Sequence, residues 1–281
     1  MLELQLHSLR QAMNLQSTLI QAAALVDGVR IDWYVSCGHW HKMQFSVEEL
    51  KTGTVNLFDH FAEIMPTQGG FVGLISLQNG IQTSFKSLGS MSQSVIDKVP
   101  EGTLFFGMYN TCSHLNLDIG RVTSERMGIA TPTVIHTAQM MGAIADTIHK
   151  INPEMIWLDV RHSEAGVIGR RAIERLTVDQ KQIFTEQFYN VSFAPAQKIP
   201  IEYALEAYNV YSDKDRITSR WAHEQDGFTY DVKILKCISP RSERILWYAD
   251  HGFMGSTYQK ELNSKIKKIR ETRGFYDGNT R

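Results

Sequence analysis

MIWLDVRHSEAGVIGRRAIERL, residues 155–176, predicts a strand that passes almost directly into a helix. Residues 155–160 form a short apolar run, which is typical of a buried strand in a parallel sheet. From residue 165 onward the apolar side chains recur at helical spacing and share one face. Only residues 161–166, RHSEAG, are left for the turn between the two elements.

Ser163 lies on this turn, which would place its hydroxyl at the carboxyl edge of the sheet. The backbone N–H groups at the start of the new helix would lie beside the hydroxyl, where they can bind an oxyanion as its charge develops. The alternative is that Ser163 only caps the helix, as serine often does. The turn by itself does not decide between these two roles.

The turn resembles the nucleophile elbow of the α/β-hydrolase superfamily, whose usual pattern is Gly-x-Ser-x-Gly. Ser163 takes the serine position, and His162 precedes it as in many lipases and esterases. Ala165 stands in place of the second glycine and is followed by Gly166. Arg161 departs from the pattern, because a small residue is usual where strand and helix crowd together around the serine.

The composition is that of an ordinary globular protein, with 43% hydrophobic and 21% charged residues among 281. The net charge of −1 gives no basic surface for nucleic acid or an anionic membrane. The chain has no run of 18 apolar residues, and residues 1–10 lack the order of a secretory signal. We therefore expect a soluble, cytoplasmic chain without a transmembrane segment, with secretion as an effector left open.

Metal and disulfide chemistry have little support in the sequence. The three cysteines, Cys37, Cys112 and Cys237, lie far apart in no metal-ligand spacing, and an odd, sparse count argues against a disulfide framework. His39 and His41 are two residues apart, but no carboxylate or cysteine accompanies them at matching spacing. We expect no metal and no cofactor.

Strand and helix patterns alternate along the chain with short connections, which predicts a mostly parallel central sheet with helices on both faces. The expected helices are 2–26, 115–127 and 140–150, and the expected strands are 30–37, 103–106, 133–136, 204–211, 229–238 and 244–249. Residues 71–85 hold Asn79-Gly80 between two apolar runs, which predicts an N-terminal hairpin at the sheet edge. The polar residues 177–194 predict a helix or a lid-like excursion.

We expect a single α/β-hydrolase-like domain over residues 1–281. Within it, residues 1–100 would form an N-terminal helix and edge strands, residues 101–260 the catalytic core, and residues 261–281 a C-terminal helix or tail.

The resemblance implies an oxyanion hole built from two backbone N–H groups. In this superfamily the strand before the first main helix ends in a His-Gly-x or Asn-Gly-x turn, and the residue after the glycine supplies one donor. Gly107-Met108 fits that place by order, with Phe106 where histidine or asparagine is usual. The implied donors are Met108 and Glu164; the alternative is that Gly107 is an ordinary glycine at a strand end.

An acidic residue follows the strand expected over 204–211, as the order Ser…Asp…His requires. Asp215, with the aliphatic Ile217 two residues later, matches the acid turn of the superfamily, and Asp213 is its rival. The alternative is a solvated charged turn, which is common.

His251 follows the last expected strand on a loop that Gly252 and Gly255 allow to bend. A histidine at this place is the base that the resemblance implies. Ser163, Asp215 and His251 thus follow the ends of three expected strands, and in a parallel sheet those ends share one edge, so the side chains can converge.

The resemblance implies a serine hydrolase that cleaves a small-molecule or lipid ester, or a related acyl bond, through a catalytic triad and an acyl-enzyme. A closer likeness, over residues 103–258, is to uncharacterised lipase-like proteins of chlamydia-like bacteria. The sequence identifies neither the substrate nor the oligomeric state.

Two other classes of protein are alternatives. One is a catalytically inactive α/β-hydrolase-fold protein that acts as a binding module or effector: Arg161 would block the elbow, and Glu164 would pair with Arg161 or His162. The other is a nucleotide-binding α/β enzyme, which is disfavoured because no Gly-x-Gly-x-x-Gly or Gly-Lys-Ser/Thr loop follows any expected strand.

Overall fold

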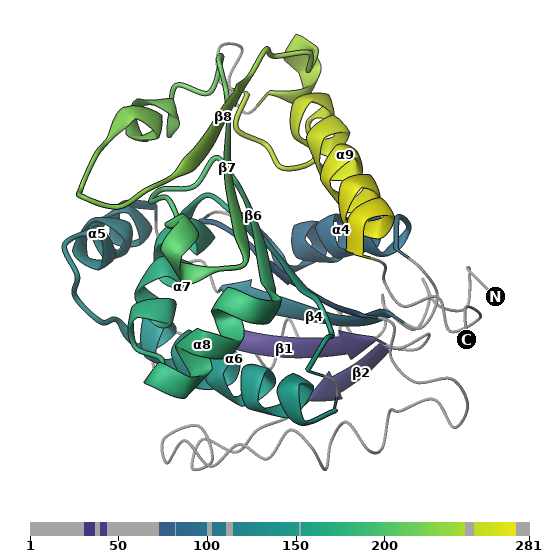
Figure 1. Cartoon of the computed structure of the whole chain (residues 1–281). Helices are drawn as coiled ribbons and strands as arrows, with labels where there is room; N and C mark the ends of the chain where they lie inside the picture. Colours follow the sequence, from purple (N-terminus) through teal and green to yellow (C-terminus); the bar gives the residue numbers. More distant parts are fainter. Residues whose placement is uncertain are drawn as a thin grey trace.

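The computed structural model describes residues 31–36, 40–43, 73–81, 83–99, 103–110, 115–151, 153–244 and 250–273 (Figure 1). Within these residues the chain forms an eight-stranded sheet of order β2-β1-β4-β3-β5-β6-β7-β8. The strands are β1 (Ile31–Ser36), β2 (Trp40–Met43), β3 (Gly73–Gln78), β4 (Thr103–Asn110), β5 (Trp157–His162), β6 (Phe188–Phe193), β7 (Glu206–Ser212) and β8 (Asp231–Leu235). Six of these strands, in the order β4-β3-β5-β6-β7-β8, are mutually parallel. Strand β1 is antiparallel to both of its neighbours, β2 and β4.

Helices cover both faces of the sheet, as the sequence predicted (Figure 1). They are α4 (Phe85–Ile96), α5 (Leu115–Arg126), α6 (Pro132–Ile151), α7 (Glu164–Glu174), α8 (Val178–Gln187) and α9 (Ser256–Arg273). Helices α6, α7 and α8 pack against one face, and α4 and α9 against the other. None of the helices in the described part of the chain is long and apolar enough to cross a membrane.

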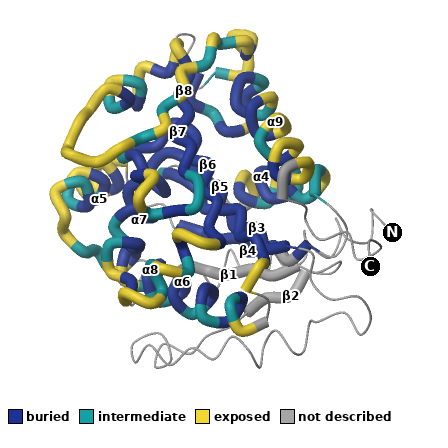
Figure 2. The backbone as a smooth tube through the Cα atoms, in the orientation of Figure 1, coloured by how far each residue is buried: buried dark blue, intermediate teal, exposed yellow. Residues whose placement is uncertain are grey.

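Strand β5 lies in the interior of the sheet, and all six of its residues are buried (Figure 2). Its side chains alternate between the two cores, as the period of a strand requires. Trp157 joins the core under α6 and α8, whereas Leu158 and Val160 join the core under α4 and α9. The strand predicted over 155–160 is therefore confirmed, shifted by two residues.

The hairpin predicted over residues 71–85 is wrong. β3 ends at Gln78 and lies between β4 and β5, parallel to both. After Asn79-Gly80 the chain enters α4, with Ser84 as the N-cap that accepts the Ser87 N–H at 3.1 Å. An Asn-Gly pair makes a hairpin only if the next residues form the partner strand, and here they form a helix. The antiparallel edge is the β1–β2 pair instead.

The short strand predicted over residues 133–136 is also wrong, because these residues form the first turns of α6. Pro132 occupies the first helical position, where its missing N–H is not needed, and the Val134 N–H donates to the Thr131 hydroxyl at 3.3 Å. These helix-start signals override the β-branched side chains that follow them.

The region predicted as a helix or lid-like excursion, residues 177–194, contains α8 and the buried strand β6. β6 lies between β5 and β7 and is parallel to both, so its aromatic side chains belong to the core. Several features of the sequence lie outside the described residues: the expected helix over 2–26, Cys37, His39, Cys112, and residues 245–249 of the last expected strand.

Candidate active site

The backbone of Ser163 is strained at the turn between β5 and α7. Its φ is 57° and its ψ is −118°, a combination that a residue with a side chain adopts at a cost of about 1–3 kcal/mol. Hydrogen bonds hold this conformation: the Ser163 N–H donates to the Phe193 carbonyl at 3.0 Å, and the Ser163 carbonyl accepts the Ala196 N–H at 2.9 Å. The side chain makes no capping hydrogen bond, so the helix-cap alternative is wrong.

Two glycines leave the space that this turn needs. A Cβ on Gly80 would lie 2.6 Å from the Ser163 Cβ and 3.2 Å from its Oγ. A Cβ on Gly166 would lie 2.5 Å from the Pro195 Cβ. Gly166, one residue after the elbow pattern, therefore lets the segment after β6 pack against the start of α7, and Gly80 lets the turn after β3 pack against the serine.

The Arg161 side chain points away from the elbow, into the face of the sheet that α6 and α7 cover. It is fully buried, forms an ion pair with Asp159 and donates to Gln78 Oε1. Its guanidinium lies over Gly169, where a Cβ would be 2.5 Å from Cζ. Arg161 therefore leaves the elbow unobstructed, and the missing first glycine of the pattern is compensated by a glycine in α7.

Three side chains from three loops form a chain of hydrogen bonds. His251 Nε2 lies 3.0 Å from Ser163 Oγ, and His251 Nδ1 lies 2.9 Å from Asp215 Oδ2. All three residues are buried. Asp213 is exposed and accepts the Cys237 N–H at 2.8 Å, so it does not face the histidine. The structure thus brings together Ser163, Asp215 and His251, and it separates Asp213 from them.

Asp215 is held in one orientation by its own turn and by α9. Its Oδ1 accepts the backbone N–H groups of Ile217 and Thr218 at 2.9 and 3.2 Å, and its Oδ2 accepts the Tyr258 hydroxyl at 3.1 Å. Burial disfavours the charged carboxylate, but the hydrogen bonds from His251 and Thr218 outweigh it, so the pKa of Asp215 lies below its usual value. The ionised carboxylate favours a proton on His251 Nδ1, which leaves Nε2 to accept from the serine.

His162 contacts the loop of His251 rather than solvent. Its Nε2 lies 2.7 Å from the His251 carbonyl oxygen, which requires the proton on Nε2, and the two imidazole rings lie 5.0 Å apart. Burial, followed by the nearby His251, lowers the pKa of His162 to about 3, so its ring is neutral. This contact spans 89 positions in the sequence, and the elbow pattern carries no signal of it.

The structure does not place Met108 at a strand-ending turn. β4 continues to Asn110, and Met108 lies inside it, in register with Trp33 on one side and Gln78 on the other. The turn that contacts Ser163 follows β3 instead and reads Asn79-Gly80-Ile81. The Asn-Gly-x signal was present in the sequence, but the hairpin interpretation of the same dipeptide concealed it.

The Glu164 side chain pairs with neither Arg161 nor His162, and that prediction is wrong. Its carboxylate is fully buried and accepts two hydrogen bonds from Arg121 of α5, at 2.7 and 2.9 Å. The Glu164 N–H begins α7, and the first N–H groups of a helix have no partner inside it. Within the described residues, no hydrogen bond takes the Ile81 N–H either.

Comparison with known proteins finds no matching family model and no matching curated protein. Several solved structures are similar. A thermophilic esterase from the planctomycete Thermogutta terrifontis is 11% identical, with 91% of this chain and 92% of that chain covered and a TM-score of 0.44. An α/β serine hydrolase without a lid from Xanthomonas campestris is 10% identical, with 74% and 85% covered and a TM-score of 0.41.

Likenesses at these TM-scores carry no argument about the chain. By its own sheet order, its helices on both faces and the serine turn after β5, the chain has an α/β-hydrolase-like fold, as the elbow resemblance implied. The closer likeness to lipase-like proteins of chlamydia-like bacteria stays a prediction.

Proposed function

We propose that this chain is a serine hydrolase that cleaves an ester or a related acyl bond. Ser163 is the nucleophile, His251 the general base and Asp215 the acid that orients the imidazole. The hydrogen-bonded chain from Ser163 Oγ through His251 to Asp215, at a strained strand-to-helix turn, carries this proposal. Nucleophile, base and orienting acid in this geometry are what acyl transfer to water requires.

In the first half of the reaction, Ser163 Oγ attacks the acyl carbon while its proton passes to His251 Nε2. The ionised Asp215 stabilises the imidazolium that forms. The tetrahedral intermediate then collapses, and the leaving alkoxide takes the proton from His251. In the second half, water attacks the acyl-enzyme with His251 again as the base, and Ser163 regains its proton as the acid product leaves.

The oxyanion of the tetrahedral intermediate would be bound by the backbone N–H groups of Ile81 and Glu164. Ile81 takes the place that the resemblance implied for Met108, because the turn after β3 is the one packed against the serine. Each donor of this kind contributes about 3 kcal/mol to transition-state stabilisation. Only backbone atoms are required, so neither side chain needs to be polar.

The alternative of an inactive binding module depended on Arg161 as an obstruction and on Glu164 as a partner of Arg161 or His162, and Glu164 pairs with Arg121 instead. The Arg161 guanidinium lies over Gly169 and bonds to Asp159, away from the serine, which removes that support. No other feature of the described residues favours it.

A fluorophosphonate probe, which bonds only to activated serines, tests the proposal. We expect the wild-type chain to be labelled and Ser163→Ala and His251→Ala to lose labelling while they remain folded. Ser192→Ala is the matched control, since Ser192 is equally buried but donates to Asn190 Oδ1 at 2.8 Å. Absence of labelling in a folded wild type would contradict the proposal.

A further inference from the structure

Glu164 places a buried carboxylate one residue after the proposed nucleophile. Three hydrogen bonds hold this carboxylate. Arg121 Nε donates to Oε1 at 2.7 Å and Arg121 Nη2 donates to Oε2 at 2.9 Å, and Asn110 Nδ2 donates to Oε2 as well. Replacing a buried ion pair by apolar side chains is often neutral or stabilising, so stability by itself does not account for this arrangement.

Asn110 also holds the turn on the other side of the serine. Its backbone N–H donates to Asn79 Oδ1 at 2.8 Å, and its carbonyl accepts Asn79 Nδ2 at 2.9 Å. Asn79 Nδ2 reaches the Gly80 carbonyl too, at 2.9 Å. The last residue of β4 is therefore hydrogen-bonded both to the turn before Ile81 and to the side chain of Glu164.

We propose that Asn110 and Arg121 are positioning residues for the oxyanion hole, which they set by joining Glu164 to the turn at residues 79–81. This inference rests on the proposed function. Neither side chain touches the reacting atoms. Together they fix the distance between the Ile81 and Glu164 N–H groups and the directions in which these groups point. The two donors lie 83 positions apart in the sequence.

A fixed separation matters because an oxyanion hole acts only when its donors lie 2.7–3.1 Å from the oxygen of the tetrahedral intermediate. Ile81 follows β3 and Glu164 follows β5. These strands are adjacent in the sheet, but no covalent link fixes the distance between the turns at their ends. A rigid, bidentate arginine–carboxylate pair and an amide donor fix that distance. The arrangement is therefore preorganised before substrate binds.

Two substitutions test this role. Asn110→Leu keeps the volume and the backbone bonds to Asn79 but removes the amide donor to Glu164. Arg121→Lys keeps the charge but loses the two-pronged geometry. With p-nitrophenyl acetate as substrate, we expect kcat to fall roughly 10- to 100-fold in each variant, with KM little changed. The affinity for phenylboronic acid, which forms a tetrahedral adduct with the serine, should fall in parallel.

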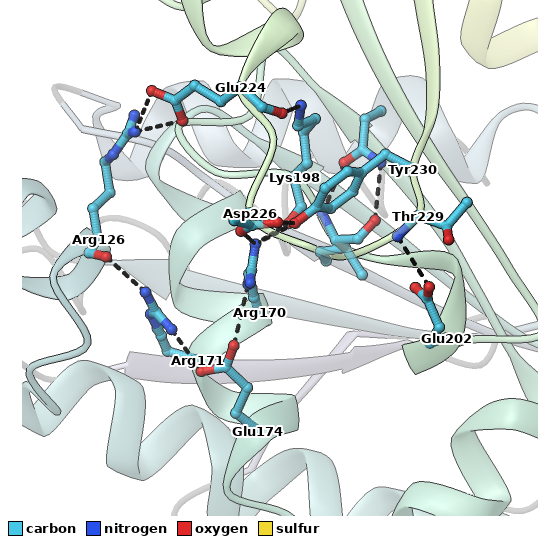
Figure 3. A network of polar contacts seen from close by, with 12 residues as sticks. Arg126, Arg170, Arg171, Glu174, Lys198, Glu202, Glu224, Asp226, Thr229 and Tyr230 are labelled. Carbon is cyan, nitrogen blue, oxygen red and sulfur yellow. Dashed lines mark hydrogen bonds and ion pairs between the residues drawn. The ribbon is translucent and has the colours of Figure 1, made fainter.

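The matched control is Arg170→Lys, the same substitution made on α7. Arg170 on α7 is equally tied to its surroundings, with Asp226 Oδ2 and the Tyr230 hydroxyl each at 2.7 Å (Figure 3). Within the part of the chain that the structure describes, Arg170 forms no hydrogen bond or ion pair with Glu164, Asn110 or the turn at 79–81. We expect Arg170→Lys to lower the melting temperature while kcat and boronic acid affinity stay at wild-type values.

The outcomes separate this inference from the proposed function. If the wild type reacts with the fluorophosphonate and hydrolyses the ester, but Asn110→Leu and Arg121→Lys lose only thermal stability, both residues are merely structural and the inference is overturned. If a folded wild type does not react with the probe at all, the proposed function fails and the inference falls with it. Should Asn110→Leu not fold, Arg121→Lys alone decides.

Discussion

At the scale of single residues, the site depends on a close approach between two turns. Gly80 is the point of contact, because its Cα faces Ser163 with no room for a further carbon. Its φ is not in the left-handed region, so the requirement comes from space rather than from backbone conformation. This makes the effect of a single methyl group at residue 80 predictable.

Gly80→Ala should damage both stability and activity. The added Cβ would lie 2.6 Å from the Ser163 Cβ, so the turn or the serine must move. Forced overpacking of this kind costs about 1–3 kcal/mol of unfolding free energy. We expect a lower urea midpoint together with a clear loss of fluorophosphonate labelling rate.

Gly120→Ala is the control for Gly80→Ala. Gly120 lies within α5, and a Cβ there meets nothing within 4 Å. Alanine is favoured over glycine inside a helix by roughly 0.5–1 kcal/mol. The control should therefore be slightly stabilised with unchanged labelling. If the two variants had the same urea midpoint and the same labelling rate, the contact between Gly80 and the serine turn would be contradicted.

The three proposed catalytic residues could be found from the sequence, whereas their supports could not. Ser163 and Asp215 follow β5 and β7, and the order of Ser163, Asp215 and His251 in the chain is informative. The strand expected before His251 lies almost wholly outside the described residues. The bond from His162 to the His251 carbonyl and the bond from Asn110 to Glu164 join residues 89 and 54 positions apart. Nothing local in the sequence marks such contacts, because both partners are chosen by the folded arrangement.

At the scale of elements, the accuracy of prediction followed how local the deciding signal was. The β5–α7 unit was predictable because its two hydrophobic periods and its turn lie within 22 consecutive residues. The hairpin at 71–85 was wrong because the partners of β3, which are β4 and β5, come later in the chain. An Asn-Gly pair carries no signal of such distant strands.

Helix α5 shows the same limit in another form. Its position was predicted, but the face it buries is mostly polar: Asp118, Val122 and Glu125 are buried, whereas Leu117 is 68% exposed. A helix normally buries its apolar stripe. Arg121 on this helix forms ion pairs with Glu164 at the start of α7 and with Asp118 one turn earlier, so a buried ion-pair network takes the place of an apolar stripe here.

Glu125 on this face should make the stability of the protein depend on pH. Burial, and then the nearby Glu164 charge, raise the pKa of Glu125 to about 8. The folded state therefore keeps a proton that the unfolded state loses above about pH 4.5, so the unfolding free energy falls as pH rises from about 4.5 to about 8. The slope from this one group is about 1.4 kcal/mol per pH unit.

Glu125→Gln removes that dependence, because glutamine has the same shape but does not ionise. We expect the variant to be more stable than the wild type at pH 8, and the two to converge toward pH 4.5. Urea denaturation at pH 5, 6.5 and 8 measures this. The difference between the two proteins reports Glu125 together with its coupling to Glu164, and a pH-independent difference would contradict the raised pKa.

At the scale of the whole molecule, the sheet assembles the site because three neighbouring parallel strands end at one edge. β3 carries the turn at 79–81, β5 carries Ser163, and β6 leads into the segment that holds the serine carbonyl. The registers of β3 and β6 with β5 are therefore as important to the site as any side chain in it. That residues 1–281 form one domain stays a prediction.

A buried ion pair lies beneath this edge and bonds to all three strands. Asp159 and Arg161 of β5 are both fully buried. Asp159 accepts the Ser76 hydroxyl from β3 at 2.5 Å and Asn190 Nδ2 from β6 at 2.9 Å. Arg161 also donates to Gln78 on β3. The pair thus fixes the relative position of the strands that carry the proposed site.

Breaking one side of the pair should be far worse than removing both. Asp159→Leu leaves the Arg161 guanidinium buried without its counter-charge, which costs about 3–5 kcal/mol of unfolding free energy. In the double variant Asp159→Leu/Arg161→Met no charge remains buried, so we expect most of that loss to be recovered. Urea denaturation of the wild type, the single variants Asp159→Leu and Arg161→Met, and the double variant gives the coupling energy directly.

The same four proteins show whether the ion pair contributes to the register of the strands as well as to stability. If the pair sets the register that the site requires, the double variant should regain stability but label with the fluorophosphonate more slowly than the wild type, because apolar side chains do not specify hydrogen-bond partners on β3 and β6. Full recovery of both stability and labelling rate would mean that backbone pairing alone holds the strands in place, and that the buried charges contribute nothing to the geometry of the serine turn.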